Sequence, residues 1–172
     1  MGDINLLTKI ENVASVFSDN GDYLKSKNLL PCTVSSNGIF TVNTDGSVTA
    51  KGTPSGTAIL QYNIKLPRGS YVLNGCPSGG SNDTYSLQLR DTNNTTIGVE
   101  TGNGYSFTLK ETKELLVLCR VSSGITVDVT YYPMIRKVGT DSTYVPYAKS
   151  NIELTSDFLM LKETLKSKGV ID

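Results

Sequence analysis

The sequence predicts a mainly β protein: a jelly-roll β-sandwich flanked by one short α-helix at each end. The first observation is composition, because only 38% of the 172 residues are hydrophobic and 19% are charged, while Thr, Ser, Asn and Gly are abundant. These residue types favour strands and turns over helices. The second observation is a series of short alternating runs between about Gly38 and Lys137, and the third is a helical period at both ends of the chain.

Residues 4–17 have the period of an amphipathic helix. Leu6, Ile10, Val13 and Phe17 recur at spacings of four, three and four residues, so a helix would place them on one face. We therefore expect residues 1–27 to form an N-terminal helix and a linker.

Residues 28–150 have the pattern of an antiparallel β-domain. Asp45-Gly46 predicts a tight hairpin, since Gly adopts positive φ without strain. Apolar side chains alternate from Thr57 to Leu66, and Lys113 to Val121 is almost continuously apolar, which is typical of a central strand covered on both faces. Further strands are expected around Tyr71–Leu73, Tyr85–Arg90, Ile97–Val99, Tyr105–Leu109 and Ile125–Tyr131. The last of these leads into Pro133–Arg136, where proline marks an edge or the end of a strand.

The total of about eight or nine strands matches a jelly roll. A nine-stranded immunoglobulin-like sandwich is the nearest alternative. The Cys-Trp-Cys pattern of its best-known branch is missing, because the chain has no Trp.

Residues 151–172 return to a helical period. Leu154, Phe158, Leu161 and Leu165 share one face of the expected C-terminal helix. Helices shorter than about 12 to 15 residues rarely persist alone in water. The two terminal helices must either pack on their own sandwich or associate between chains as a small bundle, in which these four residues and the four of the N-terminal helix would form the contact.

Charge and residue content exclude several classes of function. Sixteen basic and sixteen acidic residues give no net charge, so the long-range field of a nucleic-acid binder or of a protein that binds anionic membranes is missing. The absence of His excludes Ser-His-Asp, Cys-His and His-metal chemistry. Cys32, Cys76 and Cys119 have no CxxC spacing and are interpreted as small buried apolar residues. We expect no cofactor, no metal, no signal peptide and no membrane insertion.

An ordered series of short segments carries a resemblance over roughly residues 28–150. The segments are Asn28–Pro31, Phe40–Thr49, Leu66–Tyr71, Leu73–Gly80, Pro133–Arg136 and Tyr144–Tyr147. Together they resemble the carbohydrate-binding-like jelly rolls found in tail-tip, baseplate and fibre proteins of tailed phages and of prophages in Gram-positive bacteria.

This resemblance implies a component of the virion tail. Such a component is usually a homotrimer, and it contacts cell-surface glycan or other tail proteins. It would be made in the bacterial cytoplasm and released by lysis. The resemblance supplies no residue-level site.

A glycan site needs planar polar groups that pair with sugar hydroxyls, and an aromatic ring that covers the apolar side of the sugar. The outward sets of two expected strands supply Gln61, Asn63, Gln88 and Arg90, and Arg120 joins them if its strand is a neighbour. Tyr105, after Gly102-Asn-Gly104, is the candidate ring. The alternative is that the polar residues only solvate an open sheet face, while Tyr62, Tyr71 and Tyr85 fill the core.

Two other kinds of site are weaker interpretations. Asp83, Asp91 and Asp128 suggest calcium only by composition, because no EF-hand-like spacing is present. Among Glu100, Glu111 and Glu114, two carboxylates could form a glycosidase pair, but no catalytic residue is assigned. The sequence thus favours a weak, multivalent glycan-binding module, with a structural spacer or docking domain as the alternative and a glycan-cleaving enzyme as a minor one.

Overall fold

The computed structural model describes residues 27–31, 34–147 and 160–168. Residues 27–147 belong to one compact unit, and residues 160–168 belong to a second. The predicted N-terminal helix, with Leu6, Ile10, Val13 and Phe17, lies outside the described residues, as do Leu154 and Phe158 of the predicted C-terminal helix. Cys32 also lies outside them.

The described part of the chain is mainly β, as predicted, with ten strands in three antiparallel sheets and one short helix over residues 160–167. Ten strands exceed the expected eight or nine, partly because the stretch around Pro133 forms a strand of its own. The strands are β1 (Phe40–Val42), β2 (Val48–Gly52), β3 (Ala58–Leu66), β4 (Gly69–Asn74), β5 (Tyr85–Asp91), β6 (Thr96–Glu100), β7 (Tyr105–Leu109), β8 (Lys113–Val121), β9 (Val127–Tyr131) and β10 (Met134–Lys137).

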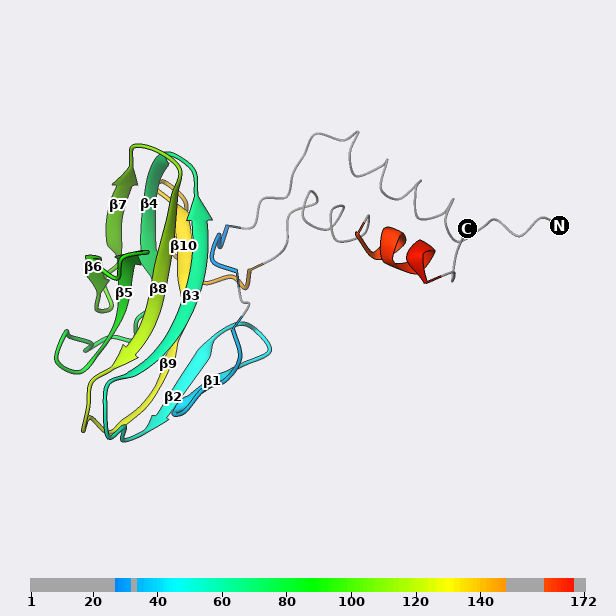
Figure 1. Cartoon of the computed structure of the whole chain (residues 1–172). Helices are drawn as coiled ribbons and strands as arrows, with labels where there is room; N and C mark the ends of the chain where they lie inside the picture. The colour runs from blue at the N-terminus through cyan, green and yellow to red at the C-terminus, as the bar shows by residue number, and fades with distance from the viewer. Residues whose placement is uncertain (1–26, 32–33, 148–159, 169–172) are drawn as a thin grey trace. The chain divides into compact units, whose positions relative to one another are not determined.

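The strand orders are β1-β2-β9, β10-β4-β7 and β3-β8-β5-β6. Figure 1 shows β3, β8 and β5 side by side in the four-stranded sheet. The predicted hairpin at Asp45-Gly46 is confirmed: it joins β1 to β2, and Gly46 has a φ of 78°. The prediction that Lys113–Val121 forms a central strand is also confirmed, because β8 pairs with β3 on one side and β5 on the other.

One hydrophobic cluster takes side chains from all three sheets. β3 alternates as predicted: Leu60, Tyr62, Ile64 and Leu66 are buried and the residues between them are exposed. Tyr62 and Tyr71 lie in this core, and Cys76 and Cys119 are buried there as free thiols. Burial raises the pKa of Cys76 to about 12, with the nearby Glu100 carboxylate as the second cause, so this thiol stays protonated and unreactive at neutral pH.

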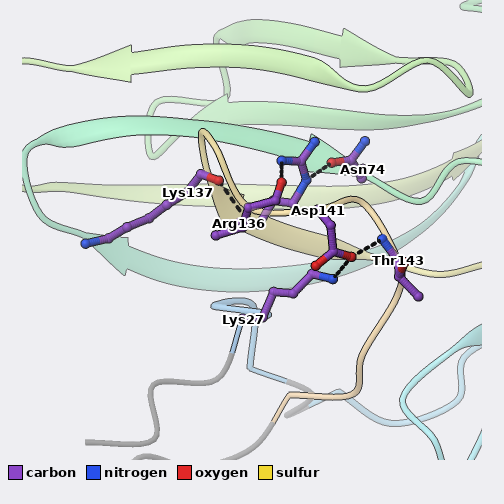
Figure 2. Close-up of polar contacts among 7 residues, drawn as sticks. Lys27, Asn74, Arg136, Lys137, Asp141 and Thr143 are labelled. Carbon is purple, nitrogen blue, oxygen red and sulfur yellow. Dashed lines mark hydrogen bonds and ion pairs between the residues drawn. The ribbon is translucent and has the colours of Figure 1, made fainter. Parts of the chain in front are cut away.

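The two ends of the 27–147 unit are joined by polar contacts along β10. The Asn28 side chain is buried; its amide nitrogen donates to the carbonyls of Pro133 and Val145, both at 3.2 Å, and its oxygen accepts from the Ile135 amide at 3.3 Å. In Figure 2, Lys27 pairs with Asp141, whose carboxylate also accepts from the Thr143 amide.

The Arg136 side chain extends the same set of contacts. Its Nε donates to Asn74 Oδ1 of β4 at 2.9 Å (Figure 2), and its Nη1 donates to the Thr140 carbonyl. These bonds hold residues 27–31 and 140–145 against the edge of the β10-β4-β7 sheet.

Glu100 holds two loops together from inside the protein. The side chain is 1% exposed. One carboxylate oxygen accepts from the Cys76 amide at 2.6 Å, and the other accepts from the amides of Gly102 and Gly104 at 2.5 and 3.0 Å. Three backbone donors therefore satisfy this buried charge.

Replacing Glu100 with Ala should destabilise the protein by about 2–5 kcal/mol, because it leaves buried backbone amides without an acceptor. Urea unfolding measures this change in the free energy of unfolding. Glu111→Ala is the matched control, since Glu111 is exposed, and it should change stability by less than about 0.5 kcal/mol. Equal effects of the two substitutions would show that the Glu100 contacts contribute no net stability.

Candidate functional site

Five of the six residues proposed for ligand binding share one face of the four-stranded sheet. The β3–β8–β5 register aligns Gln61, Leu118 and Gln88 in one row across the sheet, and Asn63, Leu116 and Arg90 in the next. Arg120 pairs with Ile59 of β3 and Ser86 of β5. Since side chains alternate between faces, all these residues lie on the side opposite the core. We call this surface the polar sheet face; its members are Gln61, Asn63, Gln88, Arg90, Leu116, Leu118 and Arg120.

The β5 side of the polar sheet face is fixed by hydrogen bonds. Arg90 donates through Nε and Nη2 to Gln88 Oε1, at 3.1 and 2.5 Å, and through Nη1 to Asn94 Oδ1 at 2.7 Å. The Gln88 amide donates in turn to Asn82 Oδ1 at 3.4 Å. The loops before and after β5 therefore both orient side chains of this strand.

Arg120 is also held in place. Its Nη1 donates to the Asn82 carbonyl at 2.6 Å and to Ser122 Oγ at 2.9 Å. Asn82 thus links two neighbouring rows of the polar sheet face, with its side chain on Gln88 and its carbonyl on Arg120.

The β3 side is more open. Gln61 and Asn63 are exposed, and the Gln61 amide donates to Asn63 Oδ1 at 3.0 Å. Leu118, in the row between Gln61 and Gln88, is only 1% exposed. The polar side chains around it therefore cover an apolar centre, and the groups of this face that a ligand can reach are the exposed amides of Gln61 and Asn63 and the half-buried arginines.

A depression of about 330 Å³ adjoins this face at one end of β3 and β8. Asn63, Lys65, Thr92, Glu114 and Leu116 contribute to its lining. Lys65 and Glu114, both exposed, form an ion pair at 3.6 Å. Its volume lies at the lower end of the roughly 300–1,000 Å³ typical of small-molecule sites.

The structure places Tyr105 away from the other candidates. It begins β7, in the β10-β4-β7 sheet, and is half-buried. Its hydroxyl donates to the Ile97 carbonyl at 2.8 Å, and its ring lies so close to Gly98 that a Cβ there would come within 2.0 Å of a ring carbon. The ring covers a glycine of β6 and stacks near Phe107, so one face of it is used inside the protein.

The expectation that Ser86 and Gln88 point to solvent is wrong. Ser86 is fully buried and Gln88 is 5% exposed. β5 lies between β8 and β6, and its Gln88 is bonded to both Arg90 and Asn82. A polar side chain on a central strand can be covered by neighbouring side chains that form hydrogen bonds with it, and it is then buried with its polar groups satisfied.

Four of the six carboxylates considered for calcium or hydrolysis serve other contacts. Asp91 Oδ1 accepts from the amides of Asn93 and Thr95, and Asp128 pairs with Lys51 at 2.8 Å. Glu100 is occupied by backbone amides, as described above. In the described ranges, no group of three or more His, Cys, Asp or Glu residues is placed to hold a metal ion.

Comparison with known proteins adds no assignment: no family model and no curated protein sequence matches the chain. None of the helical structure described for residues 27–31, 34–147 and 160–168 is long and apolar enough to cross a membrane.

Sequence reasoning missed Asn82 and Asn94, which orient the arginines, and Leu118, the apolar centre. The turns on both sides of β5 contain Asn, and this could have indicated Asn82 and Asn94, since Asn side chains in turns often accept hydrogen bonds from nearby groups. Nothing local distinguishes Leu118 from a core leucine.

Gln88→Ala should lower the free energy of unfolding by about 1–2 kcal/mol, because it removes the acceptor of Arg90 and the donor to Asn82. Gln61→Ala is the matched control, since Gln61 is exposed and bonds only to its neighbour Asn63 in the described structure; it should cost less than about 0.5 kcal/mol. Urea denaturation of both variants makes the comparison, and a Gln61→Ala cost as large as that of Gln88→Ala would contradict the arrangement.

Proposed function

We propose that this chain is a non-enzymatic component of a phage or prophage tail that binds cell-surface glycan weakly and through several copies. Its β-domain would be a jelly-roll sandwich of the carbohydrate-binding type, which the shared hydrophobic cluster of the three sheets supports. The observation that carries the proposal is the polar sheet face: two exposed amides, Gln61 and Asn63, and two guanidinium groups oriented by hydrogen bonds, beside a depression of about 330 Å³.

The arrangement of polar groups fits sugar recognition. Gln61 and Asn63 are exposed amides that both donate and accept, as sugar hydroxyls do. Because Arg90 and Gln88 are already oriented by internal bonds, less side-chain freedom is lost on binding. Only the β3 side of the face is open, since Gln88 and Leu118 are buried, and its members include no aromatic residue, so each copy would bind weakly.

Several copies would compensate for weak single sites. Joining sites can raise apparent affinity by about 10²–10⁴ without new contacts. We propose a homo-oligomer, with a trimer favoured by the resemblance to tail proteins, assembled through the terminal helices. Within the described helix, Leu161 is 54% exposed and Met160 is 69% exposed, which supports a contact that a single chain leaves open.

The non-enzymatic part of the proposal rests on the positions of the acidic residues. A general acid or nucleophile must reach the substrate. Glu100 is 1% exposed and both of its oxygens accept backbone amides, while Glu114 is paired with Lys65. The virion tail is the proposed location, after synthesis in the bacterial cytoplasm and release by lysis.

The alternative is a purely structural spacer or docking domain of the tail. The same exposed side chains of residues 160–167 favour it, since they suit a protein contact as well as a bundle. Such a domain would bind other tail proteins, with no glycan bound at the polar sheet face.

Binding of the full chain to a glycan array and to purified cell walls tests the proposal. The double variant Gln61→Ala/Asn63→Ala should weaken the affinity of each single binding site about fivefold to tenfold, because it removes two exposed amides without disturbing the core. Ser106→Ala/Thr108→Ala is the matched control, since both residues are exposed on β7 of another sheet. Failure of the wild-type chain to bind any glycan, with binding to other virion proteins instead, would favour the spacer; release of reducing sugar would establish an enzyme.

Leu161→Asp tests the proposed assembly. In an oligomer joined by this helix, a charge at Leu161 should dissociate the complex, because the apolar contact cannot compensate it. Sedimentation of the full chain measures the change in mass. Glu163→Lys is the control, because it changes a charge two residues away, on the far side of the helix. A wild-type chain that already sediments as a monomer would contradict the assembly.

A further inference from the structure

Two arginines of the polar sheet face have no carboxylate partner in the described part of the chain. The ion pairs found there join Lys27 to Asp141, Lys51 to Asp128, and Lys65 to Glu114. Arg90 bonds instead to the amide oxygens of Gln88 and Asn94, and Arg120 to a carbonyl and a hydroxyl. Neutral acceptors orient these guanidinium groups and leave their positive charges uncompensated.

This local excess of positive charge occurs in a chain with no net charge. Glu114, which lines the depression, is paired with Lys65, so these two contribute no net charge. The other members of the polar sheet face are two glutamines, one asparagine and two leucines. The face therefore carries two unpaired positive charges and no negative charge of its own.

Arginine is also the side chain best suited to oxyanions. Its planar fork matches the geometry of carboxylate and phosphate oxygens. Arg90 and Arg120 are both half-buried, so solvent still reaches them while their stems are held by the sheet. Arg120 pairs with Ser86, which lies four residues before Arg90 on β5. The backbone positions of the two arginines are therefore roughly 13–14 Å apart along the strand direction.

We propose that the ligand of this face is an anionic polysaccharide, one whose repeating units carry carboxylate or phosphodiester groups, with Arg90 and Arg120 each contacting one oxyanion. This inference rests on the proposed glycan-binding function and names the class of glycan. Two cations spaced along the sheet suit a polymer with charges at regular intervals better than a single small anion. The exposed amides of Gln61 and Asn63, on β3 beside β8, bind the hydroxyls of the sugar.

Binding of the full chain to matched polymers tests the inference. Polygalacturonate is compared with its fully methyl-esterified form, which has the same sugar backbone without the charge, and with neutral dextran. A glycerol-phosphate polymer forms a separate arm that distinguishes phosphodiester from carboxylate recognition. We expect at least one anionic polymer to bind more than tenfold tighter than the neutral polymers, and we expect this preference to fall as salt is raised from 50 to 500 mM.

Variants separate charge from shape. Arg90→Gln and Arg120→Gln should each weaken binding of the preferred anionic polymer by about threefold to tenfold, and by clearly more than they weaken binding of the neutral polymers. Arg90→Lys keeps the charge without the fork and should recover only part of the affinity. Arg68→Gln is the matched control, because Arg68 is exposed in the turn between β3 and β4.

The outcomes distinguish this inference from the proposed function. Equal binding of esterified and free polygalacturonate, with no anionic polymer preferred and no effect of Arg90→Gln, would overturn the anionic ligand and keep the glycan-binding module. Lack of binding to every polymer, charged or neutral, would overturn both. Circular dichroism of each variant confirms that loss of binding is not loss of fold.

Discussion

The pairing of β8 with strands on both sides is the constraint on which the candidate site depends. β8 aligns with β3 from Ala58 to Leu66 and with β5 from Tyr85 to Asp91. Along β8, Leu115, Val117, Cys119 and Val121 are buried in the core, while Leu116, Leu118 and Arg120 lie on the other face. A shift of one residue in either pairing would move Gln61 or Gln88 toward the core and apolar side chains outward, so core burial and site geometry are fixed by the same register.

The sequence predicted the parts of this arrangement that depend on local pattern. Alternation in β3 correctly indicated which side chains face the core, and the apolar run of β8 correctly indicated a central strand. It could not indicate that Gln88 is buried, because the polarity of a residue does not reveal which loops fold over its strand. Nor could it place Tyr105, whose ring packs on Gly98, since that contact depends on the approach of β6 to β7 in space.

Long-range polar contacts account for most of what local pattern could not predict. The sequence suggests Glu100 as one of a possible pair of catalytic carboxylates. In the fold, its carboxylate accepts hydrogen bonds from the backbone amides of Cys76 and of the turn before β7. Asn28 bonds to residues more than 100 positions away, at Pro133 and Val145. Such bonds satisfy groups that the fold has already buried, so they are consequences of topology and leave no periodic trace in the chain.

The choice of acceptors for the arginines links stability to recognition. Had Arg90 or Arg120 been paired with an aspartate, the pair would have been neutral and would have offered a ligand little electrostatic attraction. The oxygens of asparagine and glutamine residues hold the guanidinium groups in position. These neutral acceptors bind a guanidinium group less strongly than a carboxylate would, but they leave its positive charge free to attract an anion. In the proposed glycan-binding module, side chains that are already oriented would cost little to order on binding, and modest attraction at each of several copies would be enough for adhesion.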